Sequence, residues 1–134
     1  MSKSNATETA LLSYIFTATA PSWAAATDLD VHFHTADPGE AGVSTTSEAA
    51  YGSYALVTVS RATSAWTVTG NAVVNDNLIQ FPQCTSGSET LTHVSVTPSG
   101  STTILYSGAL SSPIAVSTGI QPQFAAGALT ITED

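Results

Sequence analysis

The sequence predicts a mainly β protein, an antiparallel β-sandwich or jelly roll with one short N-terminal helix. Apolar residues recur at helical spacing only before Trp23, and beyond it they follow the two-residue period of half-buried strands. Several short strand-like segments follow at fairly even spacing, with turn residues between them, which is typical of sandwiches. No long helical pattern follows them, which argues against a parallel α/β sheet. We therefore expect one domain, with residues 1–20 as N-terminal arm and helix and residues 21–134 as β-body.

The N-terminal helix is predicted from a capping box and an apolar repeat. Asn5 can cap the helix, and Glu8 lies at the third helical position, where its side chain can bond back to the cap. Residues 1–4 are expected to form a short polar arm, and the run from Thr17 to Pro21 ends the helix. Four apolar side chains recur at helical spacing and form one stripe: Leu11, Leu12, Ile15 and Phe16.

The first predicted strand covers residues 29–34. Its apolar side chains alternate with Asp30, His32 and His34, so we expect these three polar side chains to face outward. Residues 37–40 should form a turn, because its proline fixes φ and its glycine permits a positive φ. Further strands are predicted at residues 54–59, 66–68, 73–74, 78–81, 91–96, 104–106, 114–116, 121–124 and 129–132.

Charge excludes two classes of partner. Charged residues make up 9% of the chain, and the formal net charge is -8 because Lys3 and Arg61 face ten acidic residues. Nucleic-acid binding requires many lysines and arginines to neutralise phosphates, and anionic membranes require the same. We therefore expect no nucleic-acid partner and no membrane partner. Cys84 is the single cysteine, so the fold cannot depend on an intrachain disulfide.

Two histidines on one predicted strand are the best candidates for a metal site. His32 and His34 share a face with Asp30, and such a pattern can supply metal ligands. The stronger interpretation is a solvated polar face, although a three-fold axis could bring the histidines of three copies together. The acidic residues lack the spacing of a calcium loop: Asp28, Asp30, Asp37 and Glu40. We read these four as solubilising carboxylates.

The sequence carries no pattern typical of catalysis. No serine stands in a nucleophile elbow, and no glycine-rich phosphate loop precedes a helix. Cys84 and His93 show no spacing that indicates a triad. We therefore expect a protein that is not an enzyme and that binds no cofactor.

Three segments resemble a known family. They are residues 29–42, which include His-Thr-Ala-Asp-Pro-Gly; Glu48 with residues 51–55; and residues 123–131, which include Phe-Ala-Ala-Gly-Ala-Leu-Thr-Ile, with residues 107–110 upstream. From about Ala10 onward the chain is similar to a family of small tailed-bacteriophage virion structural proteins, often labelled phage tail fibre proteins. The resemblance implies a β-rich virion component, made in the host bacterial cytoplasm, with no enzymatic role.

One position departs from that family. Its members usually carry an arginine after a Tyr-Ala pair, where this chain has Leu56. The nearest arginine is Arg61. A polar contact made by the family arginine is therefore expected to be absent or rebuilt.

The position on the virion is predicted from what the chain lacks. It has neither a repeat nor a second domain that could form a shaft, which favours a capsid decoration, or cement, protein that binds and stabilises the shell from outside. The alternatives are a tail fibre or tail-tip component, or a carbohydrate-binding host-attachment module. That module would stack sugars on four aromatics: Trp23, Tyr51, Tyr54 and Trp66.

The expected partners are copies of the chain itself, as a homotrimer, and the major capsid protein or another virion protein. Low charge and abundant small polar residues permit burial between copies without stranding ions. A short helix is marginal alone in water, so its apolar stripe should be covered by packing. The predicted assembly contacts lie in the N-terminal segment: Lys3, Leu11, Leu12, Ile15 and Phe16.

Overall fold

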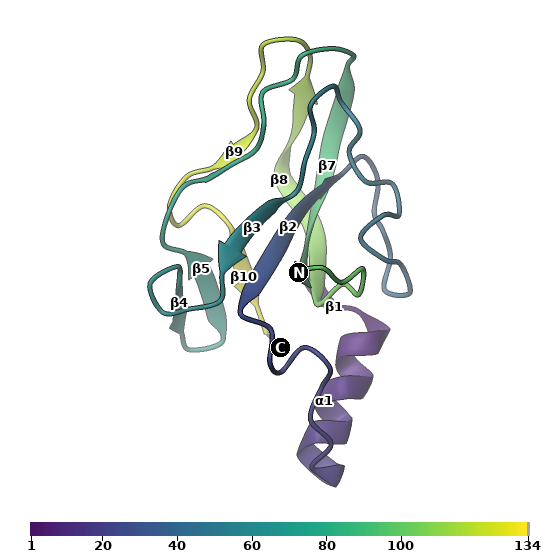
Figure 1. Cartoon of the computed structure of the whole chain (residues 1–134), viewed down its shortest axis with the longest axis vertical. Coiled ribbons are helices and arrows are strands. Elements are labelled where there is room, and N and C mark those ends of the chain that lie inside the picture. Colours follow the sequence, from purple (N-terminus) through teal and green to yellow (C-terminus); the bar gives the residue numbers. More distant parts are fainter. Residues whose placement is uncertain (134) are drawn as a thin grey trace.

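The computed structural model describes residues 1–133 as three antiparallel sheets and one N-terminal helix (Figure 1). The largest sheet has the strand order β1-β8-β7-β2-β3, a second has β10-β5-β4, and β6 pairs with β9. This architecture confirms the predicted fold class, a β-sandwich with one short helix. The elements are β1 (Ser2–Lys3), α1 (Asn5–Thr17), β2 (Asp28–His34), β3 (Val57–Ser60), β4 (Trp66–Thr69), β5 (Ala72–Asn75), β6 (Ile79–Gln80), β7 (Glu89–Pro98), β8 (Tyr106–Val116), β9 (Gln123–Phe124) and β10 (Thr130–Thr132).

The β8 strand differs from its prediction. Residues 104–106 and 114–116 were expected to be separate strands, but one continuous strand runs along β7 from Tyr106 to Val116. Its middle contains Gly108, two serines and Pro113, which are weak strand formers, so the local sequence does not signal it. A shift in register between Leu91 and His93 lets the two long strands stay paired on both sides of this irregular stretch.

The hydrophobic core lies between the five-stranded sheet and the β6-β9 pair. Phe33 of β2 is fully buried, with its ring centroid 4.3 Å from that of Phe81 and 5.1 Å from that of Phe124. Val31 faces the same side and is also fully buried, as the alternation in β2 predicts. This aromatic cluster explains why strands far apart in the chain stay together.

The first four residues do not form a free arm. Ser2 and Lys3 form β1, which pairs antiparallel with Ser107 and Tyr106 of β8. Met1 packs on Gly108, where an added Cβ would lie 2.7 Å from Met1 Cγ. The expected polar arm is therefore wrong: this segment completes an edge of the main sheet, a pairing that no short-range pattern reveals.

The helix cap also differs from its prediction. Ser4, not Asn5, is the N-cap, and its hydroxyl accepts a hydrogen bond from Thr7 N at 3.2 Å. Asn5 N instead donates to Glu40 O at 3.0 Å, on the turn that follows β2. Both residues can cap a helix, and in this fold the Ser4 hydroxyl does so.

Candidate assembly surfaces

Helix α1 projects away from the β-body (Figure 1). Among its described residues Thr7 is the buried one, and Thr7 Oγ1 donates to Ile104 O at 3.1 Å. Ser4 is also bonded to Ile104 O, and Asn5 N to Glu40 O. The first turn is thus fixed on the body, and it sets the direction of the whole helix.

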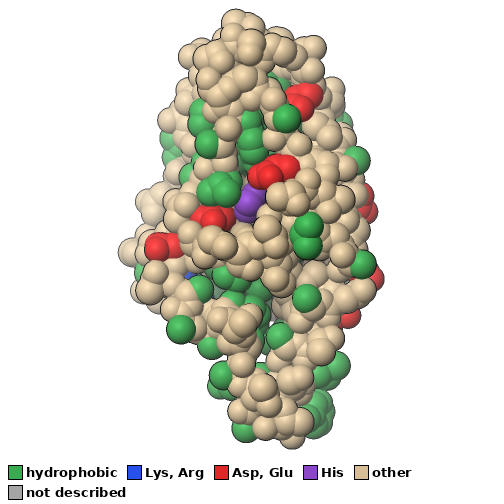
Figure 2. All heavy atoms as spheres, turned by 45° about the vertical axis from the view of Figure 1, so that its right-hand side comes forward, with side chains coloured by type: hydrophobic (Ala, Val, Ile, Leu, Met, Phe, Trp, Pro, Cys, Tyr) green, Lys and Arg blue, Asp and Glu red, His purple; other side chains and the backbone are tan. Residues whose placement is uncertain are grey.

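The far half of α1 exposes large apolar side chains. Leu12 is 58% exposed, Tyr14 55%, Ile15 68% and Phe16 78%, and none of the strands described in residues 1–133 packs extensively on the helix. Figure 2 shows hydrophobic side chains gathered at the lower tip, where α1 lies. We call these four residues the helix tip. Large exposed apolar side chains gathered on one element in this way mark interaction sites.

The predicted assembly residues of the helix differ in their exposure to solvent. Leu12, Ile15 and Phe16 lie together on the helix tip, whereas Leu11 is half-buried. Tyr14 joins them although it lies off the predicted stripe. The prediction from helical spacing left Tyr14 out because it considered a single apolar face of the helix. The far half of α1 does not pack along the body, so Tyr14 is exposed as well.

Lys3 lies in an intramolecular contact. Its ammonium group forms an ion pair with Glu133, whose carboxylate also accepts a hydrogen bond from the Tyr106 hydroxyl. These bonds, first that from Lys3 and then that from Tyr106, lower the pKa of the Glu133 carboxyl. The ion pair fastens β1 to the residue that follows β10.

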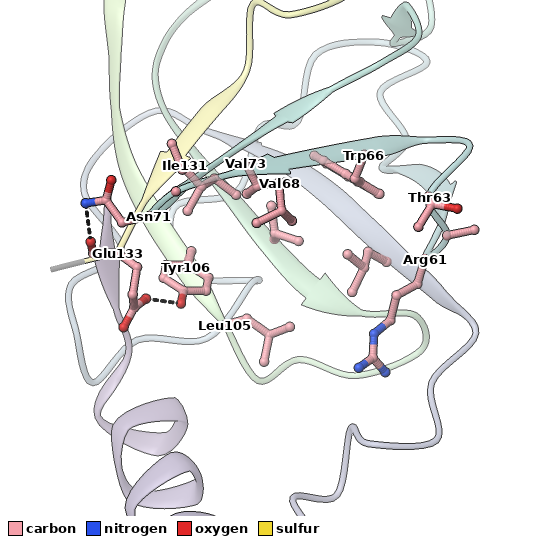
Figure 3. Close-up of a pocket in the computed structure, with 15 residues that line it drawn as sticks. Arg61, Thr63, Trp66, Val68, Asn71, Val73, Leu105, Tyr106, Ile131 and Glu133 are labelled. Carbon is pink, nitrogen blue, oxygen red and sulfur yellow. Dashed lines mark hydrogen bonds between the residues drawn. The ribbon is translucent and has the colours of Figure 1, made fainter.

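An apolar cleft of about 720 Å³ opens between the main sheet and the sheet that holds the β4-β5 hairpin (Figure 3). Among the described lining residues, charge occurs at Arg61 and Glu133, which lie at opposite ends (Figure 3). Val68 is 73% exposed, so the cleft is open to solvent. Its apolar walls come from both sheets and the loop between β7 and β8: Leu29, Trp66, Val68, Val73, Val96, Leu105 and Ile131.

Arg61 closes one end of the cleft and is engaged there. Its guanidinium donates to the carbonyl oxygens of Trp23, Ala24 and Ala26 at 2.9–3.1 Å and lies 5.6 Å from the Trp23 ring centroid. Leu56, where the family pattern has arginine, is 39% exposed. Arg61 holds the segment that returns from α1 through these hydrogen bonds.

The polar side chains of β2 do not face outward, which corrects the sequence-based expectation. His32, His34 and Asp30 are buried, with His34 fully so. The segment after β2 turns back over them: Thr35 N donates to Ser47 O and Ala49 N to Phe33 O, at 2.9 and 2.8 Å. Strict alternation marks two faces of a strand, but it does not show that a later loop covers one of them.

Both histidine rings are fully hydrogen-bonded. His32 Nδ1 lies 2.7 Å from Glu48 Oε1, and its Nε2 lies 3.1 Å from Thr97 Oγ1. His34 Nδ1 lies 2.9 Å from Thr46 O, and its Nε2 lies 2.8 Å from Ser95 Oγ. Since a carbonyl only accepts, His34 donates from Nδ1 and accepts at Nε2.

These contacts leave no ring nitrogen for a metal ion. Because His32 and His34 are buried, a symmetry axis cannot bring the rings of different copies together. Within residues 1–133, no group of three or more His, Cys, Asp and Glu side chains is arranged to hold a metal. Asp30 is also not a solubilising carboxylate, since it accepts from Thr58 Oγ1 at 2.7 Å and from Gly100 N at 3.0 Å.

The four candidate sugar-stacking aromatics do not form one platform. Tyr51 is buried and donates its hydroxyl hydrogen to Pro82 O at 2.7 Å, and burial raises the pKa of that phenol to about 12. The Tyr54 hydroxyl donates a hydrogen bond to Glu48 Oε1 and accepts one from Phe33 N. Burial also raises the pKa of the Tyr54 phenol. Trp66 lines the apolar cleft, and Trp23 lies under Arg61. The tyrosines therefore serve the core.

Comparison with known protein families identifies a matching family. The model of a family described as podophage GP4 fiber I protein gp80 matches residues 2–132. The chain belongs to this family. Its members are structural proteins of phage virions, in agreement with the resemblance seen in the sequence. A search of curated proteins found no match. In the described part of the chain, no helix has the length and apolar character of a membrane span.

Proposed function

We propose that this protein is a structural subunit of a phage fibre and that it joins its neighbours in the virion through the helix tip. The description of the family as a fibre protein supports the position. The observation that carries the attachment is the set of four large apolar side chains on α1 that the body leaves exposed. The proposed role is structural, and the buried polar groups of the described body form hydrogen bonds that stabilise the fold.

Capsid decoration is the second candidate position. The observation in its favour is the shape of the described chain, a β-body with a protruding helix and no shaft (Figure 1). A decoration protein would use the same helix tip to bind the shell. The two candidates therefore differ in where the protein sits and not in which surface attaches it.

We also propose that the assembled form is a homotrimer. With two basic residues against ten acidic ones, copies attract one another through apolar and neutral polar surfaces rather than through ion pairs. Both basic residues are already engaged within the chain. Contacts between copies therefore depend on surfaces such as the helix tip.

Gold-labelled antibody against this chain, imaged on phage particles, tests the position. Label on the tail is expected for a fibre subunit. Label over the head would overturn that position in favour of decoration. Particles without label would contradict both candidates.

Point substitutions test the attachment better than truncation does. Deleting residues 1–16 would remove β1 and the Ser4 cap together with the helix, so a loss of binding would not be specific. The double variant Ile15→Ser, Phe16→Ser leaves those contacts in place and should lower incorporation into virions by about tenfold or more. Leu78→Ser, at an exposed leucine outside the helix, is the matched control. Equal incorporation of the double variant and the control would show that the helix tip is not the attachment surface.

A further inference from the structure

We infer that the helix tip of one copy occupies the apolar cleft of the next copy, so that the chain assembles head to tail. This inference deepens the proposed function and rests on it. It pairs two apolar surfaces that the described chain leaves open: a convex one on α1 and a concave one between the two sheets. Joining them covers both with no further protein.

The chain cannot cover its own helix tip in this fold. The first turn of α1 is bonded to Ile104 O and Glu40 O, which fixes the direction in which the helix leaves the body. Thirteen residues extend about 20 Å at 1.5 Å per residue, so the tip stands well clear of that anchor. Bringing it back would break the first-turn contacts. The cover must therefore come from another molecule.

The spacing of the tip suits a concave partner. Leu12, Ile15 and Phe16 lie at i, i+3 and i+4, the anchor pattern by which a helix docks in a groove. Tyr14 adds apolar surface on another side of the helix, which a flat partner would leave in water. A cleft of about 720 Å³ is within the size range that encloses several such groups.

Charge favours the same pairing. Within α1, Glu8 is the charged residue, and it lies in the first turn, away from the tip. The two charged residues of the cleft are engaged at its ends, Arg61 with backbone carbonyls and Glu133 with Lys3. Docking would therefore bury no unpaired ion, whose desolvation is costly.

The exposed area explains why the tip needs a cleft. Phe16 and Tyr14, at 78% and 55% exposed, together offer on the order of 250 Å², because an aromatic side chain buries about 150–250 Å². A stable interface buries about 800 Å² on each partner. Contact with a flat surface would fall short of this, whereas insertion between two sheets also buries the flanks of the helix and the cleft walls.

A contact of this type is heterologous, because different surfaces of the two copies meet. Heterologous contacts close into a ring or continue as a filament. A ring of three would fill every cleft and cover every helix, in agreement with the proposed homotrimer. Each copy then gives one helix and receives one.

The sedimentation velocity of the full chain over a range of concentrations tests the inference. The unaltered protein should associate, and Phe16→Glu and Val68→Glu should each raise the dissociation constant at least about a hundredfold. Both side chains are more than 70% exposed, so neither charge disturbs the core. Leu78→Glu, outside both surfaces, should associate normally. Circular dichroism confirms that each variant is folded.

A mixture of the two variants gives the decisive result. Phe16→Glu keeps an intact cleft and Val68→Glu keeps an intact helix tip, so the pair should form a one-to-one dimer that grows no further. An unaltered protein that stays monomeric, an assembly that tolerates Val68→Glu, or a mixture that does not pair would each overturn the inference. Such a failure would leave virion labelling unaffected, so it is distinguishable from failure of the proposed function.

Discussion

The polar face of β2 and the tip of α1 have opposite relations to water. Asp30, His32 and His34 are polar and buried, and each is hydrogen-bonded within the chain. Leu12 and Phe16 are apolar and exposed. In the described residues no buried side-chain nitrogen or oxygen lacks a partner. The polar side chains of the β-body are therefore satisfied within the chain, whereas α1 packs on the body through its first turn and leaves its far half exposed.

This difference separates stability from assembly. A change in the core of the β-body should alter the free energy of unfolding and affect assembly only through folding. A change at the helix tip should alter assembly and leave the free energy of unfolding of the isolated chain almost unchanged. The same chemical substitution in the two regions distinguishes these effects.

The largest effect is expected from Phe33→Ala in the core. Removing a fully buried ring that packs against Phe81 and Phe124 should cost about 3–5 kcal/mol of unfolding free energy, measured by urea denaturation. Phe16→Ala, the same change at a side chain 78% exposed, should cost less than about 0.5 kcal/mol at concentrations where the chain is monomeric. Comparable losses in the two variants would show that the helix tip belongs to the folded core.

The next effect is expected from Ser95→Ala beneath the covering loop. Ser95 is fully buried, and its hydroxyl donates to His34 Nε2 at 2.8 Å. Its removal leaves a buried ring nitrogen without a partner, which should cost about 1–3 kcal/mol by the same denaturation assay. Ser111→Ala, at an exposed serine of β8, should change the unfolding free energy very little. If Ser95→Ala left the unfolding free energy unchanged, water would have replaced the hydroxyl, and the polar face of β2 would be open to solvent.

A smaller effect is expected from pH, through His34. Burial, the largest cause, lowers the pKa of the His34 imidazole below its ordinary 6.5, and neighbouring His32 acts in the same direction, while the bond to Thr46 O and the charge of Glu48 oppose it. The unfolded chain then binds a proton at a higher pH than the folded chain does. Stability from this group is present above about pH 6.5 and is lost as the pH falls through the lower folded value. Unfolding midpoints measured from pH 7.5 to 5 should fall, and His34→Gln should flatten the fall. An identical slope in the variant would assign it to other groups.

The sequence predicted the β-body well where the signal was local. Alternation in β2 correctly identified Val31 and Phe33 as core. Gly39 has a φ of 73° in the predicted turn, where Asp37 Oδ1 accepts from Gly39 N. These features depend on neighbours within a few residues.

Features made by distant segments could not be read in the same way. The burial of His32 depends on Glu48 and Thr97, and β1 depends on β8, about a hundred residues away. Helical spacing indicated a stripe that includes Leu12, Ile15 and Phe16, and their role in assembly stays a prediction, because spacing does not reveal whether the body covers a stripe. The cleft had no sequence signal at all, because its walls come from segments between Leu29 and Glu133 that only the fold brings together.

The smallest effect is expected from Lys3→Met, and it tests whether Lys3 belongs to the body or to the assembly. The ion pair with Glu133 is partly exposed, with the two side chains 20% and 42% accessible, so its loss should cost about 1 kcal/mol or less. The cost should shrink in high salt, because screening weakens exposed charge pairs. Glu133→Gln breaks the same ion pair, so the double variant should lose less than the sum of the two single variants. Sedimentation should show that Lys3→Met still associates. A monomeric Lys3→Met chain would instead place Lys3 among the assembly contacts, as the sequence alone suggested.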